Sequence, residues 1–550
     1  MTSPFQEGDP GSKICIIGEA PSHTEMRIGK PFVGPAGHVL DQCMHAAGMI
    51  RRECYLTNVF EEPVTKDKLG GKIWDSAGDL VWTNKGGFTA DGEKHLDSLL
   101  VRLARSKANV FVPLGNTALS ALTPHAQIMK WRGSILSSPV IGKKVVATIH
   151  PAASLRGQYI WRYIITADLR RVIKERNSSN LNLPQRTLRI NPSFEEVISY
   201  LKECLQPCNV VAEQKDVALD IEIFRHQVSC LGFAIAPDDA MCIPLVGEDS
   251  KARWSIDQEM EIWQLTAQIL NDPSIRIINQ NLSFDISVLL QQNSIITQGE
   301  LGDTMVAQHL LYPDFPKGLD FIASIHTREP YWKDDGGKMW KKMDGDYHTF
   351  WRYNAKDACV AMEAWYALEA ELHEREYWHS YQETIKLVDP LVYMMIRGFG
   401  VNLEALAKTK KEVEGKIAEK EAELLEVAER PFNPTSPKQC MEYFYVTKGI
   451  KPYVSRKTGK PTTDDKAMAR IVRRFNLPEA RLVQEIRALK KLHGTYLSAD
   501  VDGDHRMRCS YNIRGTTTGR LSSSQTIFGT GMNMQNIHPE FKSFLVADDD

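Results

Sequence analysis

Features of exported, membrane-spanning and zinc-stabilised proteins are scarce in this 550-residue sequence. Its ten cysteines include no Cys-x-x-Cys pair, and only Cys204 and Cys208 lie close together, which fits a reducing compartment without structural zinc. No run approaches the roughly 18 apolar residues that a spanning helix needs. The opening residues MTSPFQEGDPG lack the apolar core of a signal peptide. We therefore expect a cytoplasmic protein with no membrane partner.

An excess of charge of one sign is also lacking. The 67 Lys and Arg residues nearly balance the 69 Asp and Glu residues, so the net charge of −2 attracts neither nucleic acid nor anionic lipid globally. A polyanionic partner must therefore be bound by local basic patches. Apolar residues (43%) and charged residues (25%) are near globular averages, which excludes wholesale disorder.

Patterning along the chain predicts several domains, as the length also does. Short apolar runs alternate with helical periodicity over residues 1–178, which indicates an α/β domain. Residues 179–192 are rich in Asn, Ser and Pro and are predicted to form a linker. A second α/β domain is expected over residues 193–375. The remainder, 376–550, has helical character, with one long, solvent-exposed helix predicted from Leu403 to Arg430.

Acidic residues in the middle domain form the first candidate site. Asp220 and Glu222 end an apolar strand (VALDIEIF), and the strand period of two places both on one face. Asp285 follows in an apolar setting, and Tyr353 and Asp357 share a helix face at i and i+4. Four clustered carboxylates would repel one another without cations, and hard oxygen ligands suit Mg²⁺ or Mn²⁺. Two such ions can activate a water and stabilise the leaving oxygen of a phosphodiester.

The order D-x-E, N-x-x-F-D, Y-x-x-x-D resembles the three motifs of the DEDDy 3′→5′ exonucleases, the proofreading domain of family A DNA polymerases. The resemblance implies a ribonuclease H-like fold, two bound Mg²⁺ (or Mn²⁺) ions and a water oriented by Tyr353. The implied metal ligands are Asp220, Glu222, Asp285 and Asp357. The alternative for each residue is a surface acid or a helix cap. Asp303 (LGDTM) is interpreted as a helix N-cap rather than a metal ligand.

The last part of the chain contains a further motif. Residues Thr516 to Ser523 (TTTGRLSS) and Gln535 to Ile537 (QNI) resemble the stretch of family A polymerases that leads from the helical thumb into the palm. The resemblance implies a primer-template contact by Arg520 and phosphate contacts by Lys490 and Lys491. Plain solvated charge is the alternative for all three. An insert at 526–534 separates the two halves of the motif and puts the local loop geometry in doubt.

The palm and fingers motifs of that family are missing from these residues: a D-x-S-Q-x-E strand, a Lys-bearing fingers helix and an H-D-E turn. We therefore expect that this chain alone does not polymerise. It would be the leading portion of an interrupted or truncated polymerase, or a separate polypeptide would supply palm and fingers.

Glycine-rich loops mark the first domain. The segments from Gly18 to Pro21 (GEAP) and from Gly29 to Gly37 (GKPFVGPAG) resemble those of the uracil-DNA glycosylase superfamily, over roughly residues 13 to 170. This implies Glu19 in the water-activating motif, Phe32 stacking on a flipped base, Asn58 reading its edge and His150 stabilising the leaving base.

Two departures from that superfamily concern its chemistry. Ser22 stands where glycine is usual, and the spacing of Cys15, Cys43 and Cys54 does not match that of cluster ligands, so no iron–sulfur cluster is expected. The domain could be an active glycosylase, a DNA-binding or uracil-sensing module, or a structural appendage.

Together the three resemblances predict a DNA-replication polypeptide of phage type, located in the host cytoplasm if phage-encoded. Its expected activity is Mg²⁺-dependent 3′→5′ proofreading on DNA, with primer-template and a 3′ single strand as partners. The rival hypotheses are a non-catalytic DNA-binding subunit and a repair enzyme that couples uracil removal to 3′ end trimming.

Overall fold

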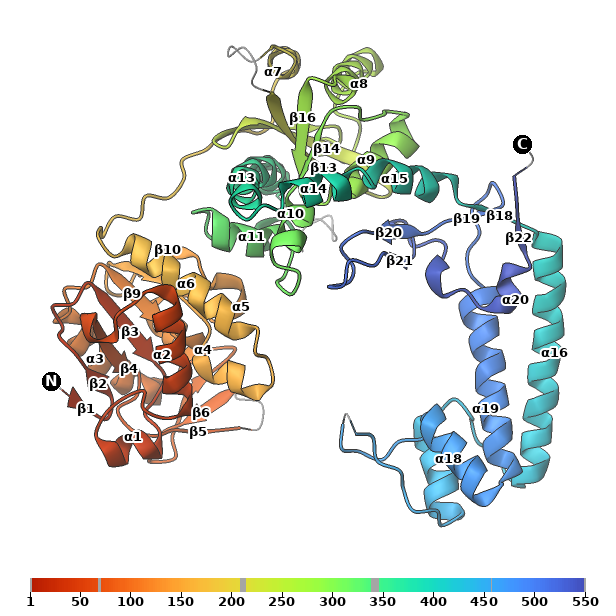
Figure 1. Ribbon diagram of the computed structural model, residues 1–550, viewed down its shortest axis with the longest axis horizontal. Coiled ribbons are helices and arrows are strands. Elements are labelled where there is room, and N and C mark those ends of the chain that lie inside the picture. Colours follow the sequence, from red (N-terminus) through yellow and green to blue (C-terminus); the bar gives the residue numbers. More distant parts are fainter. Residues whose placement is uncertain (1, 68–70, 208–213, 338–345, 457, 549–550) are drawn as a thin grey trace. The chain divides into compact units, whose positions relative to one another are not determined.

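The computed structural model describes residues 2–67, 71–207, 214–337, 346–456 and 458–548 (Figure 1). The chain divides into two compact units, Met1–Ile385 and Lys386–Asp550. None of the helices in the described part is long and apolar enough to cross a membrane. The mixed α/β, multidomain class predicted from the sequence is confirmed.

The first unit begins with a seven-stranded sheet in the order β1-β2-β4-β3-β9-β11-β10, whose strands β4, β3, β9 and β11 are parallel. Its strands are β1 (Thr2–Ser3), β2 (Gln6–Glu7), β3 (Ile14–Gly18), β4 (Cys54–Asn58), β9 (Val110–Pro113), β10 (Ile135–Ser137) and β11 (Lys144–Val146). A four-stranded sheet consists of β5 (Thr65–Lys66), β6 (Lys72–Trp74), β7 (Leu80–Thr83) and β8 (Gly87–Phe88).

Helices cover both faces of the seven-stranded sheet. They are α1 (His23–Ile28), α2 (Pro35–Ala47), α3 (Ala90–Ala104), α4 (Gly115–Leu122), α5 (Ile128–Trp131) and α6 (Trp161–Glu175), with 3₁₀ turns at Arg51–Glu53 and Pro151–Arg156. Alternate residues of β3 enter different cores. Ile14 and Ile16 pack with α2 and α6, whereas Cys15 and Ile17 pack with α3 and α4. Burial on both faces explains the continuous apolar run in the sequence.

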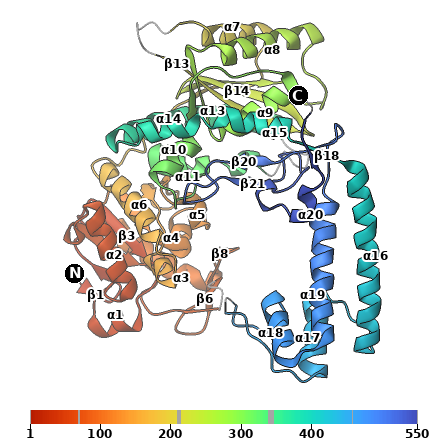
Figure 2. The ribbon, with the colours of Figure 1, turned by 45° about the vertical axis from the view of Figure 1, so that its right-hand side comes forward.

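A six-stranded sheet follows in the order β12-β15-β14-β13-β16-β17. Its strands are β12 (Thr187–Arg189), β13 (Lys215–Phe224), β14 (Gln227–Ala236), β15 (Asp239–Pro244), β16 (Ile275–Asn279) and β17 (Leu301–Asp303). Figure 2 shows α7 (Phe194–Cys204) and α8 (Ile256–Asn271) on one side of this sheet and α13 (Tyr347–Glu374) on the other. The remaining helices are α9 (Leu282–Asn293), α10 (Thr304–Leu311), α11 (Leu319–His326), α12 (Asp334–Gly337) and α14 (Trp378–Ile385).

The segment predicted to be a linker (179–192) is partly regular. Thr187–Arg189 forms strand β12, which pairs in parallel with β15 at the sheet edge. Three residues are too few to show a strand period, which is why the sequence pattern does not reveal this strand.

The two sheets of the first unit share a hydrophobic core. Phe315 and Phe321, from the region of the six-stranded sheet, lie in the same buried cluster as Val39 of α2 and Ile164 of α6. A buried hydrogen bond also joins them, from Arg132 Nη1 to Ser324 Oγ (2.7 Å). These contacts join the glycosylase-like and exonuclease-like regions of the sequence in one compact unit.

The second unit is mostly helical. It consists of α15 (Val388–Arg397), α16 (Leu403–Ala428), α17 (Pro437–Met441), α18 (Asp465–Phe475), α19 (Pro478–Lys491) and α20 (Pro539–Lys542), with π-helical turns at Glu442–Thr447 and Leu492–Leu497 and a 3₁₀ turn at Met534–Asn536. Strand β18 (Phe399–Val401) lies between β19 (Arg506–Met507) and β22 (Leu545–Val546), and β20 (Ser510–Asn512) pairs with β21 (Ser522–Ser524).

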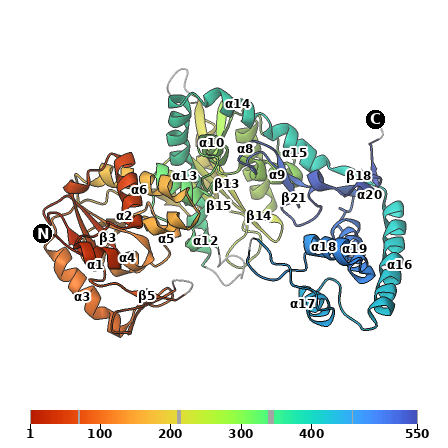
Figure 3. The same ribbon diagram turned by 60° about the horizontal axis from the view of Figure 1, so that its bottom comes forward.

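The predicted long helix corresponds to α16, which runs beside α19 in Figures 1 and 2. Most of its residues are exposed, and its buried ones are Leu406, Val413, Leu424 and Ala428. A small cluster of α17, α18 and the start of α19 packs against the end of α16, and Figure 3 shows α18 beside α19.

Candidate functional site

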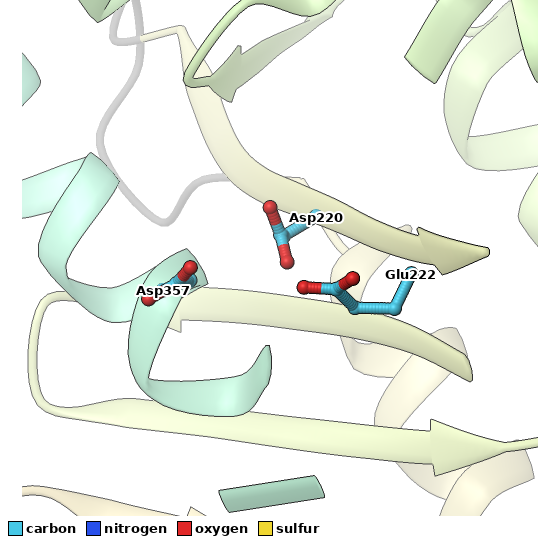
Figure 4. A group of neighbouring side chains, drawn as sticks. All are labelled: Asp220, Glu222 and Asp357. Carbon is cyan, nitrogen blue, oxygen red and sulfur yellow. The ribbon is translucent and has the colours of Figure 1, made fainter. Parts of the chain in front are cut away.

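Three acidic side chains meet beside the six-stranded sheet. Asp220, Glu222 and Asp357 each present a carboxylate oxygen, and these oxygens lie within 4.8 Å of one another. Figure 4 shows Asp220 and Glu222 projecting from β13 toward Asp357 on α13. The period of two along β13 places the first pair on one face, as the sequence predicts. Oxygen ligands at this spacing fit a hard divalent cation.

Asp220 is held by a neighbour that the sequence reasoning did not single out. Asn354 Nδ2 donates to Asp220 Oδ2 (2.8 Å) and to the Asp220 carbonyl (3.0 Å). Gly232, which pairs with Asp220 across the strands, leaves room for that amide, because a Cβ at Gly232 would lie 2.6 Å from Asn354 Oδ1. The Asn sits within the Y-x-x-x-D motif, but its spacing alone does not predict a contact with β13.

Asp285 lies beside this group but is not one of its three members. Its Oδ1 accepts a hydrogen bond from the backbone N–H of Ile221 (3.1 Å). Strand β16 pairs with β13 only as far as Ala218, so the ladder with β16 has ended before Ile221. Asp285 thus accepts a hydrogen bond from the strand residue that lies between Asp220 and Glu222.

Asp303 is confirmed as a helix N-cap. Its carboxylate accepts the N–H groups of Met305 (2.8 Å) and Val306 (3.1 Å) at the start of α10. It also accepts the N–H groups of Asn281 (3.3 Å) and Leu282 (2.9 Å) at the start of α9, the helix that carries Asp285. One buried carboxylate therefore fixes the beginning of two helices.

Tyr353 and Asp357 share a face of α13, as predicted, and two residues from the preceding segment reach them. Trp332 Nε1 donates to Asp357 Oδ1 (2.6 Å). Lys333 forms an ion pair with Asp357 and donates from Nζ to the Tyr353 hydroxyl (2.9 Å). No motif in the sequence signals Trp332 or Lys333, because both lie outside the three carboxylate motifs, and Lys333 precedes Tyr353 by 20 residues.

Burial and mutual repulsion shape the protonation of these acids. Burial, and after it the charge of Asp357, raises the pKa of Asp220 to about 7. The pKa values of Glu222 and Asp285 are also raised, first by burial and then by the charge of Asp220. Because a divalent cation would offset this repulsion, the donor set fits the metal site implied by the sequence.

A second set of predicted residues gathers at the carboxyl ends of β3 and β4. Gly18 pairs with Asn58, and a Cβ at Gly18 would lie 2.3 Å from Asn58 Oδ1 and 2.5 Å from the Phe32 ring. Phe32 and Asn58 are both buried. The absence of a side chain at Gly18 thus lets an aromatic ring and an amide approach the same point, as a base pocket requires.

Glu19, which follows β3, and His150, which follows β11, interact electrostatically. Glu19 pairs with Lys66, a residue the sequence reasoning missed, and accepts a hydrogen bond from Thr117 Oγ1 (2.8 Å). Burial opposes ionisation of Glu19, but Lys66 and His150 lower its pKa overall. Burial also lowers the pKa of His150, whose Nδ1 accepts the Ala152 N–H (3.2 Å). A neutral imidazole in that state carries its proton on Nε2.

Ser22, the departure from the glycine-rich motif, caps helix α1. Its hydroxyl accepts the Glu25 N–H, and the Glu25 carboxylate accepts the Ser22 N–H in return. The substitution therefore has a local structural role.

The basic residues singled out in the second unit differ in pairing and exposure. Lys490 pairs with Glu421 (2.6 Å), whereas Lys491 and Arg520 are exposed. The two halves of the T-x-T-G-R-L-S-S…Q-N-I motif do meet despite the insert. Gln535 Nε2 donates to the Leu521 carbonyl (3.0 Å), and its N–H donates to Ser523 Oγ (3.2 Å).

Three family models match this chain. The uracil DNA glycosylase superfamily matches residues 5–164, a 3′-5′ exonuclease family matches 196–373, and DNA polymerase family A matches 403–545. The fold and these matches define the class: a multidomain α/β chain with a glycosylase-like domain, a 3′-5′ exonuclease domain and a family A polymerase region.

Curated relatives match different shares of this chain. A DNA polymerase of Bacillus phage SP01 is 21% identical over 94% of this chain and 62% of its own length. A DNA polymerase I of Rhizobium leguminosarum is 30% identical over 49% of this chain, and a type-4 uracil-DNA glycosylase of Thermotoga maritima is 29% identical over 31% of it. The aligned parts cover 27% of the Rhizobium protein and 76% of the Thermotoga protein.

Proposed function

We propose that the carboxylate group on β13 and α13 is the active site of a Mg²⁺-dependent 3′→5′ exonuclease that proofreads DNA within a family A replication polypeptide. The observation that carries this proposal is the meeting of Asp220, Glu222 and Asp357 within 4.8 Å, beside the hydroxyl-bearing Tyr353. These residues come from the first and third motifs, and Asp285 of the second motif lies against the same strand.

The roles follow from the donor types. Asp220, Glu222 and Asp357 are metal ligands, and Asp285 of the second motif completes the ligand set. Two Mg²⁺ or Mn²⁺ ions held by these four carboxylates would supply an activated water and stabilise the leaving 3′ oxygen. Tyr353 orients the water that attacks phosphorus, with release of the terminal nucleotide as a monophosphate.

The partner proposed for the second unit is primer-template DNA, read through its phosphates. Lys491 and Arg520 are exposed, and Lys490 is partly exposed beside Glu421. Contacts of this kind are independent of sequence and weaken with salt. Polymerisation by this polypeptide would further require palm and fingers motifs, which are not among these residues.

The test uses a 5′-labelled primer on a template with Mg²⁺, with and without dNTPs. We expect shortening from the 3′ end, and a loss of at least roughly 100-fold in Asp220→Asn and Asp285→Asn. Asp238→Asn, an exposed acid in the turn between β14 and β15, is the matched control and should keep full activity. Equal digestion by wild type and Asp220→Asn would overturn the assignment.

A second candidate function belongs to the first sheet: recognition of uracil in DNA by the pocket at Gly18. The close approach of Phe32 and Asn58 there, with Glu19 and His150 beside it, is the observation that favours it. A glycosylase and a uracil sensor would both bind the base with these residues. Only the glycosylase would release it from the DNA.

A single-stranded oligonucleotide with one deoxyuridine separates these two readings. Release of uracil that is lost in Glu19→Gln and His150→Gln would establish an excising enzyme. Tight binding of the uracil oligonucleotide over its thymine counterpart, without release, would establish a sensor. Equal, weak binding of both oligonucleotides would refute the uracil pocket.

A further inference from the structure

A short segment enters the carboxylate site from outside the three motifs. This segment, 331–336, is called the strap here. Trp332 is buried, and its indole N–H donates to Asp357, while Lys333 reaches both Asp357 and the Tyr353 hydroxyl. Gly336 packs on the Tyr353 ring so closely that a Cβ would lie 2.4 Å from it. The strap therefore contacts both functional residues of α13.

The strap is anchored on the glycosylase-like region. The Tyr331 N–H donates to Ser134 Oγ (3.2 Å), and the Tyr331 ring meets Trp131 edge-on at 5.3 Å between centroids. Lys130 Nζ lies 2.8 and 2.9 Å from the two Asp334 carboxylate oxygens. The anchors thus flank Trp332 and Lys333 on both sides in sequence.

The anchoring surface is itself fixed. His125 stacks on Trp131 at 3.5 Å between ring centroids, and Lys130 also lies over the Tyr331 ring at 5.6 Å. The indole of Trp131 thus contacts both the imidazole of His125 and the ring of Tyr331. A surface held in this way limits the positions that the strap can adopt.

We propose that Lys333 is a positioning residue of the exonuclease and that Lys130, Trp131 and Ser134 of the glycosylase-like region hold it in place. The proposal rests on the exonuclease function proposed above. Because Lys333 Nζ donates to the Tyr353 oxygen, the hydroxyl hydrogen of Tyr353 must point away from the ammonium group. The orientation of the hydroxyl that directs the water is thereby restricted. The glycosylase-like region thus contributes to exonuclease activity whether or not it removes uracil.

The first test compares Lys333→Met and Lys333→Arg in the full chain. Loss of one charge-assisted hydrogen bond should lower kcat for 3′ end removal by roughly 10- to 100-fold. KM for DNA should stay within about twofold, because the group acts on Tyr353 rather than on the substrate. Lys333→Arg should restore most of the rate. An unchanged kcat in Lys333→Met, or a change in KM alone, would overturn the positioning role.

The second test concerns the anchor. Trp131→Ala should lower kcat, as Lys333→Met does. The double variant should have the same kcat as Lys333→Met alone, because both changes act through the same contact. Tyr331→Ala should act like Trp131→Ala, whereas Tyr331→Phe keeps the ring and should retain the rate. Tyr159→Ala, an exposed aromatic on the same region, is the control and should not alter kcat. Additive losses would show that Trp131 does not act through the strap.

Hydrogen exchange gives a readout that does not depend on activity. The amides of residues 332–336 should exchange faster in Trp131→Ala than in wild type or Tyr159→Ala. Equal protection in all three proteins would refute the anchor. Failure of the exonuclease proposal itself would give a different result, because wild type and Asp220→Asn would both leave DNA intact. If wild type digests DNA and Lys333→Met digests it at the same rate, only the role of Lys333 is refuted.

Discussion

Asp303 shows how much one buried carboxylate can organise. It accepts backbone N–H groups at the starts of α9 and α10, four in all, and α9 carries Asp285 into contact with β13. The sequence predicted the cap on α10 from the D-T-M pattern. The bonds to α9 come from a segment about twenty residues earlier, and only the fold brings it there.

Asp303→Ala should therefore be destabilising and should impair the exonuclease. Loss of a helix cap together with buried, unsatisfied N–H groups should lower the free energy of unfolding by about 3 kcal/mol. Urea denaturation measures the loss, and Asp314→Ala, in an exposed loop, serves as the comparison. A midpoint equal to that of wild type would show that water replaces the carboxylate at no cost.

The site residues divide by how far their partners lie along the chain. The shared face of Asp220 and Glu222 and that of Tyr353 and Asp357 could be predicted from strand and helix periods, and their roles in a site were implied by the family resemblance. Asn354, Lys333, Lys66 and Gly232 could not, because each acts through a contact with a segment distant in sequence. Periodicity reports which residues share a face, but it carries no information on what that face meets.

At the scale of elements, length decided what the sequence could reveal. The 26-residue helix α16 follows its predicted range within two residues at the carboxyl end. Strand β12, by contrast, has three residues and depends on the edge of β15, where the Thr187 N–H donates to the Asp238 carbonyl (2.7 Å). Such a strand is stabilised by its neighbour rather than by its own pattern.

Arg487 of α19 joins the small helical cluster of the second unit. Its guanidinium donates to the carbonyls of Pro434 (2.8 Å) and Thr463 (2.5 Å), in the loops that precede α17 and α18. Arg487→Leu leaves both carbonyls without this partner, so the free energy of unfolding of this cluster should fall by about 2 kcal/mol. A protease should then cleave the cluster faster.

Limited proteolysis over residues 430–465 checks this prediction. Arg473→Leu, on the exposed face of α18, removes the same charge without those two bonds and should leave the cleavage rate unchanged. Equal protection of Arg487→Leu and Arg473→Leu would contradict it.

At the scale of the whole molecule, a buried lysine connects the regions of the first unit. Lys144 Nζ of β11 donates to Glu175 Oε2 (2.8 Å) and to the carbonyls of Glu175 and Asn180 (both 3.1 Å). Arg328, from the exonuclease region, pairs with the same Glu175 carboxylate. Lys144→Met removes one partner of a buried pair and should lower the free energy of unfolding by about 3 kcal/mol, as measured by urea denaturation. Lys143→Met, the exposed neighbour, should cost almost nothing.

This cluster also sets a pH dependence. Burial opposes ionisation of Glu175, but hydrogen bonds from Arg328 and Lys144 lower its pKa overall. A lowered folded-state pKa adds stability above the unfolded value of about 4.3. That stability is lost as the pH falls through the folded-state pKa. In Lys144→Met the pKa of Glu175 is lowered less, because one hydrogen bond to its carboxylate is lost. The difference in unfolding free energy between pH 7 and pH 3 should therefore be smaller than in wild type. A difference as large as in wild type would contradict the coupling.

The burial of Phe315 and Phe321 in the core of the neighbouring region has a consequence for inheritance. Recombination within residues 179–192 would pair one region with a foreign companion and leave an apolar face exposed to water. This packing therefore favours retention of the two regions together, although they match separate families.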